Sequence, residues 1–266
     1  MSATPLRRGL SLCVGWLSDR GLPRPLREPL FRAYAKAYGV NLAEVRLPLA
    51  EHPSFAAFFV RRLADGARSF PADPAVLPAP CDGTVQSVDA IAKDTILQAK
   101  GRPYSVRELL GGCGAELDLE DGASWTIYLS PRDYHRVHAP VDGRLTEAHW
   151  LPGARYSVAP KVLAARERVF SINERCVMRI ETARGPLLCV MVGALNVGRI
   201  RVVGVEAAAS GKLDAPRKLA RGDELARFEM GSTVILIVPR GGPRPIEGLA
   251  PGRALRMGEV IGRMGA

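Results

Sequence analysis

Residues 228–238 read Phe-Glu-Met-Gly-Ser-Thr-Val-Ile-Leu-Ile-Val, a turn followed by an unbroken apolar run. The β-branched and aliphatic side chains of residues 234–238 predict a buried strand. In front of this run, Gly231 has a carbonyl that can be approached closely, because glycine has no Cβ. Its neighbour Ser232 carries a hydroxyl nucleophile. The stretch has two interpretations. It is an ordinary turn before a core strand, as glycine and serine commonly form, or the chain cleaves itself here and converts Ser232 into a prosthetic group.

The composition is that of a globular protein with a basic surface. The 266 residues are 47% hydrophobic, which is enough for a sizeable core in one large domain or in a domain with a helical appendage. A formal net charge of +10 suits an acidic partner, either nucleic acid or an anionic membrane surface. The five cysteines are scattered without C-x-x-C spacing, which indicates a reducing compartment and no zinc site.

No apolar run approaches the roughly 20 residues that a helix needs to span a bilayer. Arg7 and Arg8, followed by the apolar residues 10–17, resemble a weak signal peptide, but no small-residue cleavage site follows them. If this chain meets a membrane, we expect it to lie on the surface.

Residues 1–70 are predicted to form a helical, basic region. Its apolar residues form two stripes with helical spacing, Leu26, Leu30, Tyr34 and Tyr38 in the first and Phe55, Phe58, Phe59 and Leu63 in the second. Ser54 is a suitable N-cap for a helix that begins at Phe55. The region holds eleven basic and five acidic residues, so eleven minus five gives +6 of the total +10. Arginines beside large apolar side chains are typical of an interfacial helix, although helices that only cap a core can have the same composition.

From residue 71 the sequence predicts a mostly β domain, which begins with the proline-rich connector 71–80. Strands are expected at residues 82–88, 125–129, 176–180, 187–192, 200–205 and 234–238, a hairpin turn at 141–145 and an edge strand within 257–262. Ser105 and Glu108 match a capping box and predict a short helix over 105–110. The absence of a βαβ rhythm, of G-x-G-x-x-G and of a P-loop lysine argues against a nucleotide-binding fold.

Two of the four histidines, His135 and His138, lie three residues apart. On a helix they would share a face and could bind a metal. Pro131 and Pro140 bracket the segment, however, and an extended chain would turn the two rings to opposite sides. No third ligand has suitable spacing, so metal binding is disfavoured. A plain structural role for one of the histidines stays open, because intermediate burial is normal for histidine.

Asp82 lies in an Asp-Gly turn, which needs no function to explain it. Together, Asp82, a histidine and Ser232 supply the parts of a nucleophile relay. The carboxylate orients the imidazole, the imidazole takes the hydroxyl proton, and the oxygen attacks a carbonyl. The hydrolase signature G-x-S-x-G is absent around Ser232. The flexible Gly231 next to it suggests its own carbonyl as the target.

Over roughly residues 25–240 the chain resembles the proenzymes of the phosphatidylserine decarboxylase family. Each matching segment is short, but their order and spacing together are highly specific. They are Phe58-Phe59-Val60-Arg61-Arg62-Leu63, Pro80-Cys81-Asp82-Gly83-Thr84-Val85, Lys100-Gly101 with Tyr104-Ser105, the run from Tyr128 to His138, Asn173-Glu174-Arg175, Val192-Gly193-Ala194 with Asn196-Val197-Gly198, Gly222-Asp223-Glu224-Leu225 and Met230-Gly231-Ser232-Thr233-Val234. The family most often has leucine where this chain has Met230, a volume-conserving exchange beside the reacting pair.

The resemblance implies a role for each candidate residue. His138 resembles the base for self-cleavage and Asp82 its orienting carboxylate, while Ser232 would attack the Gly231 carbonyl. An N-to-O acyl shift and β-elimination would release a β chain, residues 1–231. They would leave a covalent pyruvoyl group, derived from Ser232, on an α chain of residues 232–266. This pyruvate-derived cofactor would form a Schiff base with the substrate amine, and His135 resembles the proton donor in the later decarboxylation.

The resemblance also implies the reaction and its setting. The substrate would be phosphatidylserine and the products phosphatidylethanolamine and CO2, a carboxy-lyase step of phospholipid biosynthesis. Because lipid tails leave a bilayer at a cost of about 0.8 kcal/mol per CH2, residues 1–70 would dock the enzyme on the cytoplasmic face of the bacterial cell membrane. The expected fold is α+β, with this helical region followed by a mostly antiparallel, barrel-like β core over 71–266. The two fragments would form a β/α heterodimer that dimerises further, without metal or nucleic acid.

Two other functions fit parts of the sequence. A β-sandwich carrier module with a basic arm would present a modifiable lysine on a hairpin, whereas residues 230–232 contain none. A serine hydrolase could use Asp82, His138 and Ser232 on an external ester. Nucleic-acid binding is a further use for the positive charge, but the chain shows no known motif for it. A denaturing gel separates these hypotheses, because only a proenzyme yields two fragments of very unequal size.

Overall fold

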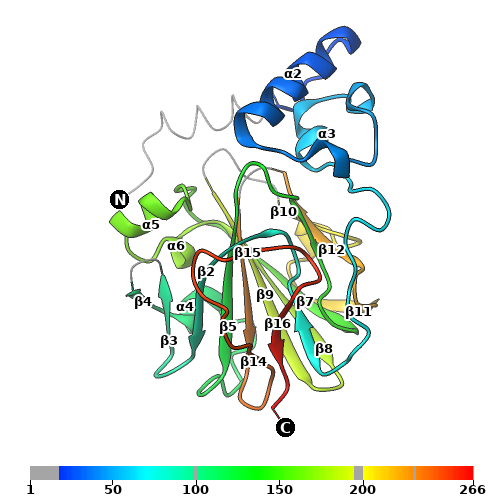
Figure 1. The fold of residues 1–266 in the computed structure, drawn as a ribbon. Coiled ribbons are helices and arrows are strands. Elements are labelled where there is room, and N and C mark those ends of the chain that lie inside the picture. Colours follow the sequence, from blue (N-terminus) through cyan, green and yellow to red (C-terminus); the bar gives the residue numbers. More distant parts are fainter. Residues whose placement is uncertain (1–17, 99–100, 195–199, 230–231, 266) are drawn as a thin grey trace.

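The computed structural model describes residues 18–98, 101–194, 200–229 and 232–265. A helical unit lies at one end of the molecule, and strands make up most of the rest, with three short helices near β3 and β4, as Figure 1 shows. The helices are α2 (Arg24–Tyr38), α3 (Phe55–Phe59), α4 (Val106–Leu110), α5 (Pro160–Ala165) and α6 (Val169–Ile172), with 3-10 turns η1 (Leu42–Glu44), η2 (Leu49–Glu51) and η4 (Ala207–Ala209). The strands are β1 (Val76–Pro78), β2 (Gly83–Ala90), β3 (Thr95–Gln98), β4 (Arg102–Ser105), β5 (Ala123–Leu129), β6 (Arg136–His138), β7 (Gly143–Leu151), β8 (Arg175–Thr182), β9 (Gly185–Gly193), β10 (Ile200–Val202), β11 (Gly211–Leu219), β12 (Glu224–Phe228), β13 (Ser232–Val238), β14 (Arg244–Pro245), β15 (Ala254–Leu255) and β16 (Val260–Arg263).

The largest sheet has eight antiparallel strands in the order β11-β7-β8-β9-β13-β5-β2-β15. The predicted strand at 234–238 is confirmed as β13, which begins two residues earlier, at Ser232. It pairs with β5 on one side and β9 on the other. Val234, Leu236 and Val238 pack into one apolar core, and Ile235 and Ile237 into another on the opposite face. Burial on both faces explains why this strand is an unbroken apolar run and not an alternating one.

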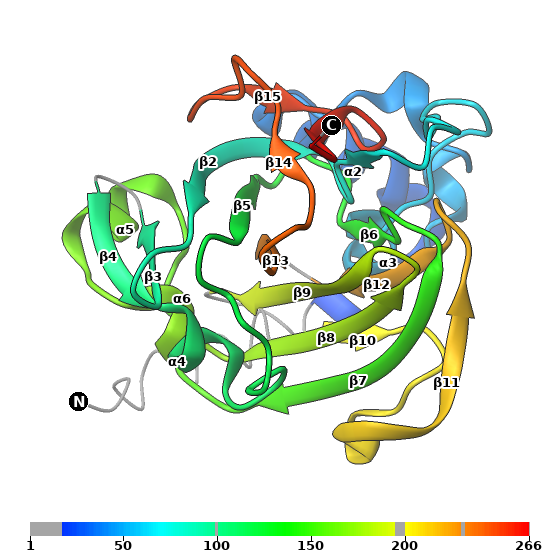
Figure 2. The ribbon, with the colours of Figure 1, turned by 90° about the horizontal axis from the view of Figure 1, so that it is seen from below.

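The eight-stranded sheet curves strongly, as Figure 2 shows, but the expected barrel-like core is not a closed barrel. Its end strands β11 and β15 do not pair with each other in the described chain. Two smaller sheets, β10-β12-β6 and β1-β16-β14, contribute side chains to the core that contains Leu236. The α+β class therefore holds, and the architecture is one of open antiparallel sheets.

Several local predictions are corrected by this topology. The turn at 141–142 does not form a hairpin, because β6 pairs with β12 whereas β7 pairs with β8 and β11. The carboxy-terminal strand β16 lies between β1 and β14 and is not an edge strand. The strand predicted over 200–205 ends at Val202. Ser105 caps α4 as expected, because its Oγ accepts a hydrogen bond from Glu108 N at 3.0 Å.

Residues 18–65, which we call the amino-terminal unit, have a small core of their own, formed by Phe31, Ala35, Val40, Leu49 and Phe58. Ser54 caps α3 as predicted, because its Oγ accepts a hydrogen bond from Ala57 N at 3.2 Å. The stripe on α2 is not the core face, since Leu26, Leu30 and Tyr38 are 57%, 44% and 51% exposed. After α3 the chain is irregular up to β1, so helix covers less of this region than predicted. None of the helices in the described ranges is long and apolar enough to cross a bilayer.

Candidate active site

The start of β13 lies beside the segment that carries both histidines. The backbone of Ser232 pairs with Leu129 at the end of β5 and with Gly193 at the end of β9. From Leu129 the chain continues into residues 130–135, which we call the histidine loop. In the ladder that follows, Phe228 N donates to His135 O at 3.0 Å, and Glu224 pairs with His138. His135 therefore lies opposite a residue four positions before Ser232, and His138 opposite one eight positions before it. The Ser232 side chain and Gly231 lie outside the described residues.

His135 is completely buried. Its Nδ1 lies 2.8 Å from the carbonyl oxygen of Asp133, so Nδ1 carries the proton and Nε2 is left as the acceptor. Nε2 is buried and has no hydrogen-bond partner among the described residues. The ring lies against Phe59 of α3, with centroids 4.0 Å apart. Burial, opposed by the bond to Asp133 O and assisted by the charge of Arg61, lowers the pKa of His135 to about 3, so its imidazole is neutral at physiological pH.

His138 has the same tautomer for a similar reason. Its Nδ1 lies 2.7 Å from Gly222 O and donates to that carbonyl. Its Nε2 lies 3.1 Å from the Tyr134 hydroxyl, which therefore acts as the donor. Burial lowers the pKa of His138, although the Gly222 carbonyl partly opposes this shift. Burial also raises the pKa of Tyr134 to about 12, so this phenol keeps its proton. Each histidine thus offers a basic Nε2 and is oriented by a backbone carbonyl.

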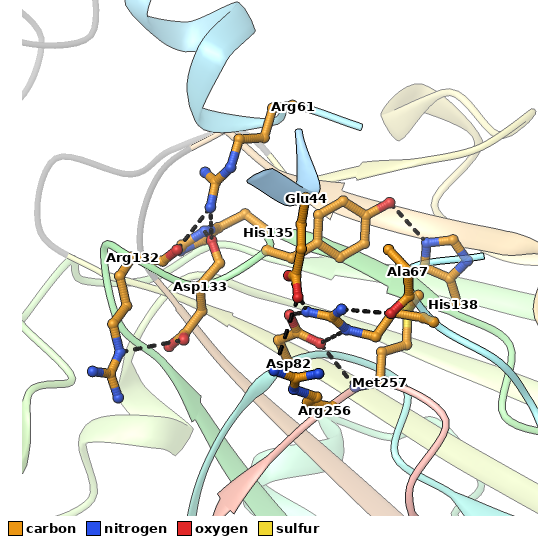
Figure 3. Close-up of polar contacts among 12 residues, drawn as sticks. Glu44, Arg61, Ala67, Asp82, Arg132, Asp133, His135, His138, Arg256 and Met257 are labelled. Atoms are coloured by element: carbon orange, nitrogen blue, oxygen red, sulfur yellow. Dashed lines mark hydrogen bonds and ion pairs between the residues drawn. The ribbon is translucent and has the colours of Figure 1, made fainter. Parts of the chain in front are cut away.

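The structure does not place Asp82 in contact with either histidine. Its Oδ1 accepts hydrogen bonds from Arg68 Nε and from Met257 N, both at 2.8 Å, and its Oδ2 accepts from Arg68 Nη2 at 2.6 Å, as Figure 3 shows. Arg68 also bonds Glu44 at 2.9 Å. The Gly222 carbonyl therefore occupies the orienting position on His138 that the sequence suggested for Asp82. Relay geometry among Asp82, His138 and Ser232 stays a prediction, because the serine side chain is not described.

A cavity of about 430 Å³ brings His138 and the Asp82 partner Arg68 to one space. Tyr134 and Met257 also line it, so Asp82 lies directly behind its wall. Three arginines contribute to the lining, Arg46, Arg62 and Arg68, together with the carboxylates of Asp65, Asp223 and Glu224. A cavity with this mixture of charges is suited to a small zwitterionic or anionic group.

Sequence reasoning missed three residues that shape this site, Arg61, Arg68 and Tyr134. Arg61 stands in the Phe-Phe-Val-Arg segment, and an arginine two residues after a pair of aromatic residues is the signal that could have identified it. Nothing in the sequence around Arg68 pairs it with Asp82, since the bond joins an irregular segment to a turn and depends on the tertiary fold. The groups of Gly222 and Asp133 that accept from the histidines are backbone carbonyls, which side-chain patterns do not reveal.

A second polar cluster lies away from this site. It contains three potential metal-ligand atoms that all lie within 4.8 Å of one another, one each from Cys113, Glu147 and His149. In the structure His149 Nε2 lies 2.8 Å from Glu147 Oε2, and Arg179 lies 3.3 Å from Glu147 Oε1. The carboxylate is thus already paired with a cation, and burial raises the pKa of the Cys113 thiol to about 12. These groups are satisfied as a hydrogen-bond and ion-pair cluster.

A model of the phosphatidylserine decarboxylase family matches residues 55–263. A phosphatidylserine decarboxylase proenzyme of Halorhodospira halophila is 45% identical over 256 residues, covering 91% of this chain and 86% of the relative. Proenzymes of the same name from Myxococcus xanthus and Marinobacter nauticus are 38% and 35% identical, each covering 96% of this chain and at least 93% of the relative. Together with the arrangement of β13 and the histidine loop, these matches show that the chain belongs to the phosphatidylserine decarboxylase family.

Proposed function

We propose that this chain is a proenzyme that cleaves itself between Gly231 and Ser232 and then converts phosphatidylserine to phosphatidylethanolamine and CO2. One observation supports this most strongly. Ser232 begins a strand in the interior of the sheet and pairs with Leu129, directly before the loop that leads to His135 and His138. Family membership supplies the reaction class, a carboxy-lyase step in phospholipid synthesis. This pairing supports the proposal because it joins the backbone of Ser232 to the strand that leads into the only segment of the sequence with two closely spaced histidines.

Self-cleavage is an exchange of bonds within the chain. His138 Nε2 exchanges the Tyr134 hydroxyl for that of Ser232 and accepts its proton, and Oγ attacks the Gly231 carbonyl carbon. The C–N bond breaks and an ester forms; removal of the Ser232 α-proton then expels the Gly231 carboxylate. The nitrogen leaves as ammonia after water adds, so residue 232 ends as a ketone. The Nδ1–H bond to Gly222 O fixes the basic Nε2 that this step needs. For Asp82 to orient this imidazole in the relay, its carboxylate exchanges its bond to Arg68 for one to Nδ1 and replaces the Gly222 carbonyl there.

The structure is compatible with a pyruvoyl group at position 232. Strands β5 and β9 pair with this residue from both sides, so a new amino terminus there would stay in place after cleavage. His135 Nε2 is buried and has no partner among the described residues, which leaves an acceptor free for a reacting group. A bound pyruvoyl ketone supplies an electron sink for loss of CO2. His135 then delivers a proton to the substrate carbon, and because burial keeps His135 neutral, Nε2 must first take up that proton during turnover.

The amino-terminal unit is suited to membrane docking. Leu26, Leu30 and Tyr38 project from α2 into solvent, with the exposed side chains of Arg24 and Arg32 on the same helix. Apolar residues beside arginines suit the interface of a membrane that contains anionic phosphatidylserine. We place the enzyme on the cytoplasmic face of the cell membrane, as a β/α heterodimer that dimerises. In flotation assays, Leu26→Ser/Leu30→Ser should release the protein from phosphatidylserine-containing vesicles, and unchanged flotation would refute this docking face.

Intact-mass spectrometry and a denaturing gel test the proposal directly. Wild-type protein should give two unequal fragments, the shorter one reactive toward hydrazine, and Ser232→Ala should give one inactive full-length chain. His138→Ala should block cleavage, whereas His135→Ala should mature but decarboxylate poorly. If His135→Ala fails to mature while His138→Ala matures, the two histidine roles are reversed. A single unbroken chain that hydrolyses esters would instead support the serine hydrolase.

A further inference from the structure

The amino-terminal unit binds the histidine loop through three consecutive backbone carbonyls. The Tyr34 hydroxyl donates to Pro131 O at 2.9 Å, and Arg61 Nη2 donates to Arg132 O at 2.7 Å and Asp133 O at 3.2 Å. In the opposite direction, Arg136 Nε donates to Val60 O at 2.9 Å. The unit that carries the exposed apolar face is thus fastened directly to the loop that ends at His135.

One of these carbonyls connects Arg61 to His135. The oxygen of Asp133 accepts both from Arg61 Nη2 and from His135 Nδ1, as Figure 3 shows. The bond to Nδ1 fixes the tautomer of the imidazole and the direction of Nε2. Phe59, two residues before Arg61, packs on the imidazole ring itself. The short segment 59–61 therefore restrains His135 twice, through the ring face and through the carbonyl that orients it.

The placement of Arg61 is unusual for a structural residue. The residue is 4% exposed and its guanidinium donates to the neutral carbonyls of Arg132 and Asp133, with the Phe58 ring centroid 5.5 Å from the guanidinium carbon. Nε and Nη1 have no hydrogen-bond partner within the described residues. Removing a cation from water is costly, and burial lowers the pKa of Arg61 although the charges of Asp133 and Asp82 oppose the shift. An apolar side chain would therefore hold α3 on the loop at lower cost. A buried guanidinium in this position indicates a function beyond packing.

We propose that Arg61 is a positioning residue for His135, so that the amino-terminal unit completes the active site in addition to docking it. The guanidinium fixes the Asp133 carbonyl, and this carbonyl holds the imidazole with Nε2 directed at the reacting group. The inference rests on the proposed role of His135 in decarboxylation. It separates two functions of the unit, since Leu26, Leu30 and Tyr38 of α2 are exposed whereas Arg61 is buried against the histidine loop.

Two substitutions and a matched control test this inference. Arg61→Met removes the donor at similar length, and Arg61→Lys keeps a cation that can reach only part of the carbonyl pair. The control is Arg27→Met, because Arg27 also donates to two backbone carbonyls, Leu22 O and Ala50 O, but entirely within the amino-terminal unit. Fragments are quantified on a denaturing gel, and kcat and KM are measured on mixed micelles of phosphatidylserine and detergent.

We expect Arg61→Met to mature into two fragments and to lose about a hundred-fold in kcat with little change in KM, the scale of a small misplacement of a catalytic group. Arg61→Lys should recover part of that loss, and Arg27→Met should stay within about two-fold of wild type. Wild-type kcat in Arg61→Met, or equal losses in Arg61→Met and Arg27→Met, would overturn the positioning role.

A spectroscopic readout covers the case in which Arg61→Met does not accumulate as folded protein. In histidine-labelled Ser232→Ala protein, His135 should give the NMR signature of a single Nδ1–H tautomer, and Arg61→Lys or Tyr34→Phe should broaden or shift it. An unchanged signature in both variants contradicts the inference. His135→Ala is the independent test of the proposed function: if it keeps wild-type kcat, the role of His135 fails, and if it loses kcat while Arg61→Met does not, only the positioning inference fails.

Discussion

The Asp82 carboxylate accepts a hydrogen bond from the backbone N–H of Met257 at 2.8 Å, across the point where the chain is proposed to break. Asp82 belongs to the longer fragment and Met257 to the shorter one. The same two parts are joined where Trp125 Nε1 donates to Ile261 O at 2.9 Å. With β13 between β5 and β9, and β16 between β1 and β14, the short fragment supplies interior strands to two sheets. Cleavage at this point would therefore leave two chains whose side chains pack in the same apolar clusters.

We expect the two fragments to stay associated after maturation. Apolar burial of β13 on both faces and pairing on both edges make the short fragment part of the core, so its release would expose both apolar clusters. Native mass spectrometry and gel filtration should show one species of about the mass of the whole chain or a multiple of it, while a denaturing gel shows two bands. Loss of the short fragment during dialysis without denaturant would contradict this expectation.

We expect Arg68 to contribute to the stability of the folded protein. It bonds Asp82 and Glu44, its side chain is 7% exposed, and hydrogen bonding to it lowers the pKa of Glu44. Arg68→Met leaves both carboxylates without their cation and should cost about 3 kcal/mol of unfolding free energy. The loss in Arg68→Met/Asp82→Asn should be smaller than the sum of the single losses, because the two residues form one ion pair. Urea denaturation in a Ser232→Ala background measures this, and strict additivity would count against the pairing.

Acid should destabilise the protein before its carboxylates are protonated. Burial lowers the pKa of His52, His135 and His138 in the folded chain, whereas an unfolded histidine titrates near 6.5. Below that pH the unfolded chain binds protons that the folded chain does not, so the free energy of unfolding falls as pH drops from about 6.5 to 5. A fully buried histidine contributes a slope that approaches about 1.4 kcal/mol per pH unit.

The experiment that tests this compares how steeply the free energy of unfolding changes with pH, and not its absolute value. In the uncleaved Ser232→Ala background, urea denaturation between pH 7 and 5 should give a flatter curve for His135→Asn than for the parent protein, because one non-titrating residue replaces a histidine whose folded pKa is about 3. A parallel curve would show that His135 is not held neutral by the fold.

The sequence predicted those elements whose signal is local. The apolar run at 234–238, the Ser54 and Ser105 caps and the hairpin strands β8 and β9 were found because spacing and capping act over a few residues. The predictions were wrong or incomplete for three features that depend on which distant strands pair. These features are the barrel-like core, the 141–145 hairpin and the position of β16. At the site, residue types identified the two histidines, but their partners are the carbonyls of Gly222 and Asp133, which only the folded chain brings near.

A substitution at Gly258 tests whether the turn that contains it positions the Met257 N–H for its hydrogen bond to Asp82. The φ of Gly258 is +91°, and a Cβ added there would lie 1.9 Å from the carbonyl oxygen of Ser69. Gly252 has nearly the same φ, +92°, with no atom within 4 Å of its added Cβ. Gly252→Ala should therefore cost only the backbone strain, about 1 kcal/mol, whereas Gly258→Ala adds a backbone clash that must displace the turn.

We expect Gly258→Ala to lower the free energy of unfolding by at least about 2 kcal/mol more than Gly252→Ala, because displacement of the turn also removes the Met257 N–H from Asp82. Urea denaturation of both variants in the Ser232→Ala background gives this difference. Equal costs for the two substitutions would show that the turn at 256–259 shifts freely, and that Asp82 does not depend on Met257 for its position.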